Sequence, residues 1–368
     1  MTRRRLLFAD PRGYGRVVSP RSTAVAALAA ALVPVASAQA ATKTVYMGNP
    51  PSAAKTLSNL RADVNAYFPE RITIRRGDKV RFVPSGLHTL DLVRGKTPVG
   101  LVSGGAPITG TRDPGGVPFW FNGQPDLELS APLLNVAFGK SVSYDGSGEV
   151  QSGLPLVTKP LTVRFTKTGN FTYFCNIHPG MKGTVNVIGG KAPSAKVDSK
   201  AVKQQISQAV KDARRLQQAL VHNNQVLLGN SSRSGVEVLE MFPAAMNVAV
   251  GTTLTFSISR WSLAAHTATA GPGDPLTEPD SFLGRISESI RNTPPFDQAG
   301  VYPSDPRGTP ALLTPNLHGN GFWSSGFMDR ANSTPQQPKN QQVKVVAPGT
   351  YTFYCMLHPF MRVVVNAH

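Results

Sequence analysis

The sequence has few of the residues that bind metals or form disulfides. Its 368 residues include 2 Cys, 7 His and 8 Met, which excludes a disulfide framework and leaves any metal chemistry to a small set of side chains. Long apolar runs are also missing. The stretch from Ala24 to Val35 has twelve residues, whereas a helix that spans a bilayer needs about 20. We therefore expect no transmembrane segment and a soluble mature chain.

Acidic residues are scarce as well, with 21 Asp and Glu against 38 Lys and Arg and a formal net charge of +17. Residues 1–40 hold six of the Arg, an apolar run and two small-residue cleavage patterns, as in an export signal. Removing them leaves a charge of about +12. We expect an exported protein, periplasmic, cell-surface or secreted, whose charge suits an acidic partner. Nucleic acid is not expected, because no basic run interleaves with aromatics.

A repeat with a spacing of about half the chain divides the remainder. Phe-Pro, Gly and Phe recur at identical intervals from Tyr67 to Phe82 and from Met241 to Phe256. Within both copies, apolar residues alternate around a turn, as in half-buried strands. These residues are Ile72, Ile74, Val80 and Phe82, then Val248, Val250, Leu254 and Phe256. We predict an all-β protein with one β-sandwich in each domain. The predicted domains are 41–190 and 229–368, with long insertions at 94–155 and 271–338.

Residues 191–228 form the predicted linker between the domains. From Lys191 to Asn223 apolar residues recur at helical spacings, which predicts an amphipathic helix with a basic outer face. The apolar positions are Val202, Ile206, Val210, Ala213, Leu216 and Leu220. A helix packed on one domain is the simpler interpretation, and a docking surface is the alternative.

Each copy of the repeat contains one cysteine, in the pattern Cys-x-x-His-x-x-Met. The two motifs are Cys175-His178-Met181 and Cys355-His358-Met361, and an earlier His-Thr pair accompanies each, at His88 and His266. A thiolate, two imidazoles and a weak thioether are the donors that suit copper in both of its oxidation states.

Four other interpretations of these cysteines are weaker. Structural zinc gains little from a thioether. A disulfide between Cys175 and Cys355 is compatible with export, but it would leave two matched ligand loops unused. A nucleophilic Cys-His pair needs only one copy. Packing of Cys and Met in the core does not explain the fixed spacing in duplicate.

These residues resemble the blue (type 1) copper proteins, or cupredoxins, of plastocyanin and azurin type, over roughly residues 60–188 and 235–367. The loop from Cys355 to Met361 is most similar to that of amicyanin. The resemblance implies two Greek-key sandwiches joined by the linker helix, with two type 1 coppers. The implied ligands are His88, Cys175, His178 and Met181, and His266, Cys355, His358 and Met361. Many cupredoxins have Asn after the first His, where this chain has Thr89 and Thr267.

The resemblance implies single-electron transfer between redox partners rather than an enzyme. Multicopper oxidases and copper nitrite reductases need further histidines, in His-x-His motifs or beside the type 1 cysteine, and Asn176 and Met356 follow the cysteines here. Only His222, His318 and His368 remain, in isolation. Copper storage or delivery is the alternative function. We expect His178 and His358 to lie nearest the surface as electron ports, flanked by Gly180 and Phe360.

Overall fold

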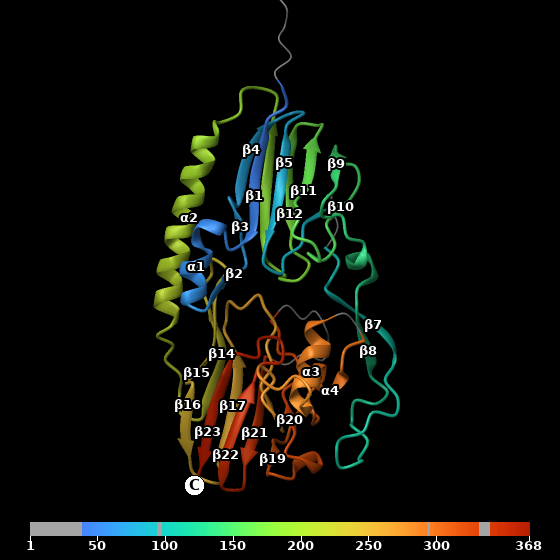
Figure 1. Cartoon of the computed structure of the whole chain (residues 1–368), viewed down its shortest axis with the longest axis vertical. Helices are drawn as coiled ribbons and strands as arrows, with labels where there is room; N and C mark the ends of the chain where they lie inside the picture. The colour runs from blue at the N-terminus through green and yellow to red at the C-terminus, as the bar shows by residue number, and fades with distance from the viewer. Residues whose placement is uncertain (1–38, 94–97, 293–294, 331–338) are drawn as a thin grey trace, which may run out of the picture. The chain divides into compact units, whose positions relative to one another are not determined.

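The computed structural model describes residues 39–93, 98–292, 295–330 and 339–368. The predicted export signal lies almost wholly outside these ranges. Residues Ala40–His368 form one compact unit, built mostly from strands (Figure 1), which confirms the predicted fold class. Among the described residues, no helix has the length and apolar character needed to cross a membrane.

Residues 42–188, here the first half, form two five-stranded sheets. The first sheet has the order β3-β1-β5-β11-β9 and the second β10-β6-β12-β13-β4. The strands of the first sheet are β1 (Thr42–Gly48), β3 (Tyr67–Phe68), β5 (Lys79–Ser85), β9 (Ser141–Tyr144) and β11 (Leu161–Phe165). Those of the second are β4 (Arg71–Arg75), β6 (Asp91–Leu92), β10 (Val150–Gln151), β12 (Gly169–Phe174) and β13 (Lys182–Ile188).

Residues 225–367, the second half, have the same strand order. One sheet runs β19-β21-β17-β14-β15, and β2 (Ala62–Val64) from the first half is added at its edge beside β15. The other sheet runs β16-β23-β22-β18-β20. The strands of the first are β14 (Gln225–Ser231), β15 (Val236–Phe242), β17 (Thr253–Ile258), β19 (Ala311–Leu313) and β21 (Asn340–Val345). The other contains β16 (Ala245–Val248), β18 (Thr269–Ala270), β20 (Trp323–Ser324), β22 (Gly349–Tyr354) and β23 (Arg362–Ala367). β14 begins inside the predicted linker, so that linker is shorter than expected.

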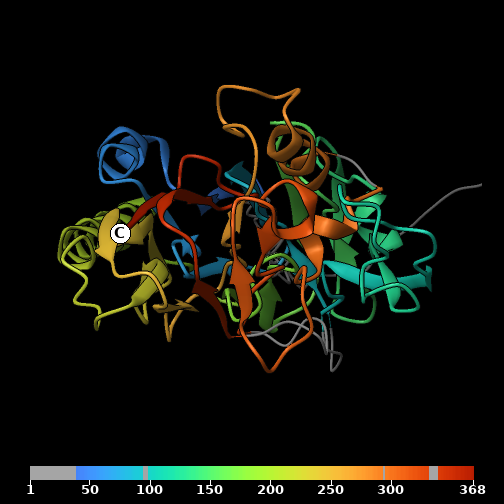
Figure 2. The same ribbon diagram turned by 90° about the horizontal axis from the view of Figure 1, so that it is seen from below.

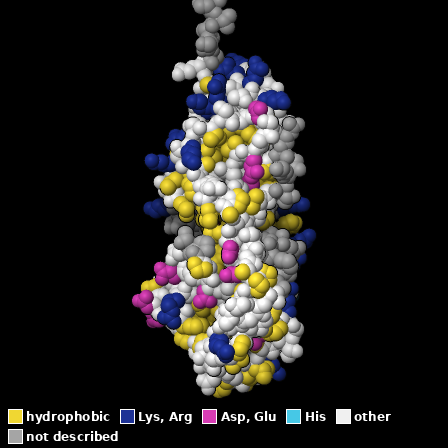
Figure 3. Space-filling view, turned by 90° about the vertical axis from the view of Figure 1, so that its right-hand side faces the viewer, with side chains coloured by type: hydrophobic (Ala, Val, Ile, Leu, Met, Phe, Trp, Pro, Cys, Tyr) yellow, Lys and Arg dark blue, Asp and Glu magenta, His cyan; other side chains and the backbone are white. Residues whose placement is uncertain are grey.

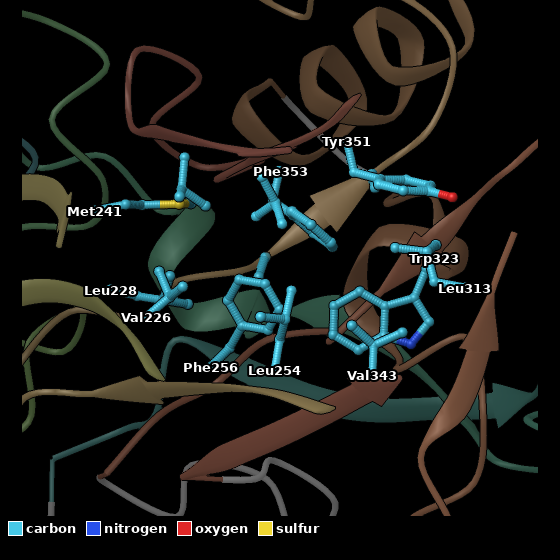
Figure 4. Packing of buried hydrophobic residues seen from close by; sticks show 14 of the residues in the cluster. Val226, Leu228, Met241, Leu254, Phe256, Leu313, Trp323, Val343, Tyr351 and Phe353 are labelled. Carbon is cyan, nitrogen blue, oxygen red and sulfur yellow. The ribbon is translucent and has the colours of Figure 1, made fainter. Parts of the chain in front are cut away.

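The two sheets of each half enclose an apolar core. Ile72, Ile74, Val80 and Phe82 are all buried in the first core, and Leu254 and Phe256 in the second, where Figure 4 shows Phe256 and Trp323 among the packed rings. The alternation predicted from the sequence therefore holds at these positions. Val250 is an exception, because it lies in the turn after β16 and is exposed.

Two helices and one short strand form a separate apolar cluster beside β15. The helices α1 (Pro51–Asn59) and α2 (Ala195–Leu216) pack there with β2 (Ala62–Val64). β2 belongs to the first half by sequence but pairs antiparallel with β15, with Asp63 opposite Glu237. The predicted linker helix is present, with Ala213 and Leu216 buried and the earlier apolar positions partly buried, and it ends before Leu220, which is fully exposed.

The two long insertions contain structure of their own and pack on one another. The first forms the ribbon of β7 (Val102–Pro107) and β8 (Pro125–Leu129) and the 3-10 helix η1 (Ala131–Leu134). The second forms α3 (Phe282–Arg291), α4 (Gln298–Val301) and the 3-10 turn η2 (Leu317–Gly319). Phe121 and Leu127 share an apolar cluster with Leu283 and Tyr302. Figure 2 shows this ribbon on the opposite side of the sheets from α1 and α2.

Candidate metal centres

The first centre lies where β12 turns into β13. Cys175 directly follows β12 and Met181 directly precedes β13, and because these strands pair antiparallel the loop between them is short. Two backbone hydrogen bonds close it: Cys175 N donates to Met181 O (3.1 Å) and Met181 N to His178 O (2.9 Å). His88 arrives from the segment after β5. Its Nδ1 lies 3.1 Å from Nδ1 of His178, which is 3.6 Å from Sγ of Cys175.

The second centre has the same construction between β22 and β23. Cys355 N donates to Met361 O (3.0 Å) and Met361 N to His358 O (2.7 Å). Sγ of Cys355 lies 3.6 Å from Nδ1 of His358 and 3.8 Å from Nδ1 of His266. In both centres the ligand atoms of the two His and one Cys lie within 4.8 Å of one another, close enough to hold one metal ion.

The methionines of the two motifs are buried next to these groups. Met181 belongs to the same core cluster as Cys175, and Met361 to that of Cys355. The structure thus groups two His and one Cys in each half, and it places each Met in the loop and core cluster of its Cys. Both cysteines are free thiols, which excludes the disulfide alternative.

The threonine after each first histidine braces the cysteine loop. Oγ1 of Thr89 accepts a hydrogen bond from Asn176 N (2.7 Å), and Oγ1 of Thr267 accepts one from Met356 N (2.7 Å). The backbone N–H of each threonine also points at the cysteine sulfur, at 3.5 Å in the first centre and 3.4 Å in the second. Thr therefore forms the brace that Asn provides in many cupredoxins, and such outer contacts orient the ligands.

The groups of the first centre are held in their neutral forms. Burial lowers the pKa of His88 to about 4. Burial, reinforced by the neighbouring His88, lowers the pKa of His178 to about 3. Burial also raises the pKa of the Cys175 thiol. Removing an ionisable group from water disfavours its charged form, which accounts for all three directions.

The second centre contains a buried carboxylate that the sequence analysis did not find. Oε1 of Glu237, on β15, accepts hydrogen bonds from Nε2 of His266 (2.9 Å) and from Oγ of Ser262 (2.5 Å). Burial opposes ionisation of Glu237, but these hydrogen bonds outweigh it and lower its pKa. Likewise, burial alone would raise the pKa of Cys355, but hydrogen bonds with His266 and His358 hold it well below its ordinary value.

His178 and His358, the histidines within the two Cys-x-x-His-x-x-Met motifs, differ in their exposure. His178 is buried at 8% relative exposure, and a side chain at neighbouring Gly180 would meet Leu263 of the second half at 3.1 Å. His178 is thus more exposed than His88, Cys175 and Met181, but the second half covers its loop and keeps it buried. His358 is half-buried. A groove of about 700 Å³ lies beside its loop, lined in part by Pro359 and Phe360.

The donor sets of both centres fit copper. Two imidazoles and one thiolate converge, with a thioether in the same loop, and no carboxylate belongs to either set. This chemistry is consistent with type 1 sites, in which soft sulfur and imidazole donors serve both oxidation states. Of the three other histidines, His318 binds Asp113 and Asp305. The described residues contain two such groups and no third.

Comparisons with known proteins return cupredoxins among solved structures, whereas no family model and no curated protein matches the chain. A reduced amicyanin variant is 16% identical, with 33% of this chain and 73% of that chain covered and a TM-score of 0.19. Plastocyanin from the fern Dryopteris crassirhizoma is 16% identical, with coverage of 39% and 99% and a TM-score of 0.20. A pseudoazurin from Sinorhizobium is 18% identical, with coverage of 47% and 98% and a TM-score of 0.21.

Proposed function

We propose that this chain is an exported blue copper protein that binds one type 1 copper in each half and passes single electrons between redox partners. The observation that carries the proposal is the pair of matched His-Cys-His groups, buried except for the half-buried His358, each with a methionine in the same loop. The proposed ligands are those of the two motifs and the two earlier histidines: His88, Cys175, His178, Met181, His266, Cys355, His358 and Met361. Copper bound there would supply reversible one-electron chemistry.

The protein's contribution is a rigid donor set shielded from water. Backbone hydrogen bonds close both ligand loops, and Thr89 and Thr267 tie each loop to the segment that carries the first histidine. Side chains that are buried and hydrogen-bonded on several sides change little in position when the charge of the site changes. A small rearrangement favours rapid electron exchange, and it favours a carrier over a protein that must open to release its metal.

The distribution of histidines supports a carrier over an oxidase. Outside the two centres, His222 and His368 are exposed, and both ring nitrogens of His318 bind carboxylates, Asp113 and Asp305. Additional copper at a domain interface needs several histidines that converge. No such cluster occurs among the residues that the structure describes.

We propose that the partners are acidic and that the basic first half attracts them. Residues 41–190 hold 16 Lys and Arg against 9 Asp and Glu, while residues 229–368 hold 9 of each. Figure 3 shows Lys and Arg gathered at the end of the first half where β4 meets β5, with Arg76, Lys79, Arg164 and Lys167 exposed there. An uneven charge of this kind steers an oppositely charged protein and raises its rate of association.

Copper titration of the full chain tests the proposal. We expect two Cu(II) per chain and an intense thiolate-to-copper absorption band, because each centre contributes one thiolate. Cys175→Ser and Cys355→Ser should each remove one copper and about half of the band. A colourless protein, or two coppers retained in both variants, would contradict the proposal.

A transfer experiment separates the carrier from the storage alternative. The loaded protein is mixed with a Cu(I) chelator in one sample and with a small one-electron oxidant or reductant in another. A carrier exchanges electrons rapidly and releases copper slowly, because its donors are buried. Rapid loss of copper to the chelator, with slow electron exchange, would support storage or delivery instead.

A further inference from the structure

The two centres differ on the side of the first histidine that faces away from the cysteine. Nε2 of His266 lies 2.9 Å from Oε1 of Glu237. Nε2 of His88 is buried and has no hydrogen-bond partner in the described part of the chain. Gly48 and Gly86 lie against it, since a Cβ at these residues would be 2.6 Å and 3.2 Å from that nitrogen. One histidine therefore contacts a carboxylate and the other a backbone surface.

The repeat explains where the carboxylate comes from. The Phe-Pro pairs at Phe68 and Phe242 are 174 residues apart, and the same spacing aligns Glu237 with Asp63, its partner across β2 and β15. The Asp63 carboxylate is one methylene shorter and accepts a hydrogen bond from the adjacent Val64 N (2.8 Å). The first half therefore has an acidic residue at the equivalent position, but that residue does not reach His88.

Contacts from both halves hold the Glu237 carboxylate in place. Oγ of Ser262 donates to Oε1 (2.5 Å), and Nδ2 of Asn65 donates to Oε2 (3.4 Å). Glu237 is 1% exposed and His266 is fully buried. A carboxylate only accepts hydrogen bonds, so the ring proton lies on Nε2. Without metal, Nδ1 shares a proton with the sulfur of Cys355. When copper replaces that proton, Nδ1 is free to donate its lone pair to the metal while Nε2 stays protonated.

We propose that Glu237 is a positioning residue that holds the ring proton of His266 on Nε2 and gives the second centre the lower reduction potential of the two. A carboxylate that accepts from a ligating imidazole makes that imidazole a stronger donor, and stronger donation favours the oxidised form of a metal. His88 has no such acceptor. The buried Asp91 of the first half binds Asn176 and Gln151 rather than a ligand histidine.

This inference rests on the proposed function, and single-centre variants of the full chain test both. Cys175→Ser retains the second centre and Cys355→Ser the first. In each variant, the intensity of the thiolate-to-copper band measures the oxidised fraction of the remaining centre at a given applied potential. At a common applied potential we expect the ratio of oxidised to reduced protein to be at least tenfold larger for the second centre. For a one-electron couple this corresponds to about 59 mV. Equal potentials, or a lower potential in the first centre, overturn the inference.

Glu237→Gln, placed in both backgrounds, identifies the residue responsible. With Cys175→Ser we expect the potential to rise, with a tenfold fall in the ratio of oxidised to reduced protein at the same applied potential. With Cys355→Ser we expect a much smaller shift, because Glu237 contacts His266 but acts on His178 of the first centre only through its charge. A neutral amide keeps the shape but accepts more weakly, and Glu237→Asp should retain part of the effect. Equal shifts in both backgrounds, or no shift in either, would show that Glu237 does not set the potential.

A measurement on the unaltered protein does not depend on whether the Glu237 variants fold. In the reduced, copper-loaded chain, nitrogen-15 NMR should detect a slowly exchanging proton on Nε2 of His266, and a proton on Nδ1 instead would overturn the inference. If neither single-centre variant shows a thiolate-to-copper band, the proposed function itself fails. If both bands appear with equal potentials, only the role of Glu237 fails.

Discussion

The two halves of this chain have one strand order and one ligand loop, but their metal centres have different surroundings. Around the first centre, burial keeps the histidines and the thiol neutral. Around the second, the ionised Glu237 contacts a ligand histidine. Strand pairing and loop spacing therefore determine which donors converge. Residues that lie outside the motif determine the charge that surrounds those donors.

The residue after each cysteine shows the same contrast. Asn176 donates from Nδ2 to Asp91 Oδ2 and to Val99 O, both at 2.8 Å, so polar contacts hold the first loop. Met356 occupies the equivalent position in the second half and packs in the apolar cluster with α3 and α4. A hydrogen-bonded network fixes geometry through direction, whereas apolar packing fixes it through volume. The two loops should therefore respond differently to the same kind of substitution.

The largest expected difference between the centres concerns two matched glycines. Gly48 and Gly229 both have positive φ, at 94° and 69°. A Cβ at Gly48 would lie 2.5 Å from the His88 ring, while one at Gly229 would lie 2.9 Å from both Glu237 and His266. We expect Gly48→Ala to destabilise the protein by about 3 kcal/mol and to abolish the band of the first centre. Gly229→Ala should weaken the second centre less.

Gly123→Ala provides the control for backbone strain. Its φ is 92°, close to that of Gly48, but a Cβ there meets nothing within 4 Å. We expect a loss of about 1 kcal/mol in the free energy of unfolding and two intact centres. If all three variants kept both bands, the comparison between the halves would fail. That result would show that close contact with Gly48 and Gly229 does not position His88 and His266.

A smaller difference is expected at the threonine braces. Valine has the shape of threonine without the hydroxyl, so Thr89→Val and Thr267→Val each leave one buried N–H without its acceptor, at a cost of about 1–3 kcal/mol. Oγ1 of Thr89 also donates to Oδ1 of Asn176 (2.8 Å). We therefore expect the larger loss in the first half, measured as the free energy of unfolding and the energy of the thiolate-to-copper band. Equal losses would show that the Asn176 network adds nothing to the brace.

Three of the four proposed donors in each half could be grouped from the sequence because their spacing is local. Cys175, His178 and Met181 occupy one turn between two adjacent strands, and a turn of fixed length brings its residues together in any sandwich of this kind. The alternating apolar residues around Gly77 likewise predicted the core faces.

Contacts between distant strands were not predictable from the sequence. Glu237 is separated from His266 by 29 residues and Asn176 from Asp91 by 85, and no periodic pattern marks either pair. Alternation could not assign Glu237, because Val236 and Val238 are buried as well. Leu263 covers the loop of His178 through packing between the halves, and this cover was not predictable from the spacing of the motif either.

The smallest expected effect concerns His318, which joins the insertions of the two halves. It tests whether the halves can be compared as separate units. Its Nδ1 lies 2.9 Å from Oδ2 of Asp113 in the first half, and its Nε2 lies 3.3 Å from Oδ2 of Asp305 in the second. Both ring nitrogens donate only when the ring is protonated. Burial alone would lower the pKa of His318, but the bonds to Asp305 and Asp113 outweigh it and raise that pKa above 6.5.

The sign of the resulting pH dependence follows from that shift. The folded protein holds the proton more tightly than the unfolded chain, so this stabilisation is complete below pH 6.5 and is lost as pH rises through the folded pKa. We expect a loss of about 1 kcal/mol in the free energy of unfolding, measured by denaturant titration at increasing pH. His318→Gln should remove this component, and the exposed His222→Gln should not. If His318→Gln and the unaltered protein lose stability in parallel, this ion pair adds nothing to the joining of the halves, and each centre can be treated independently of it.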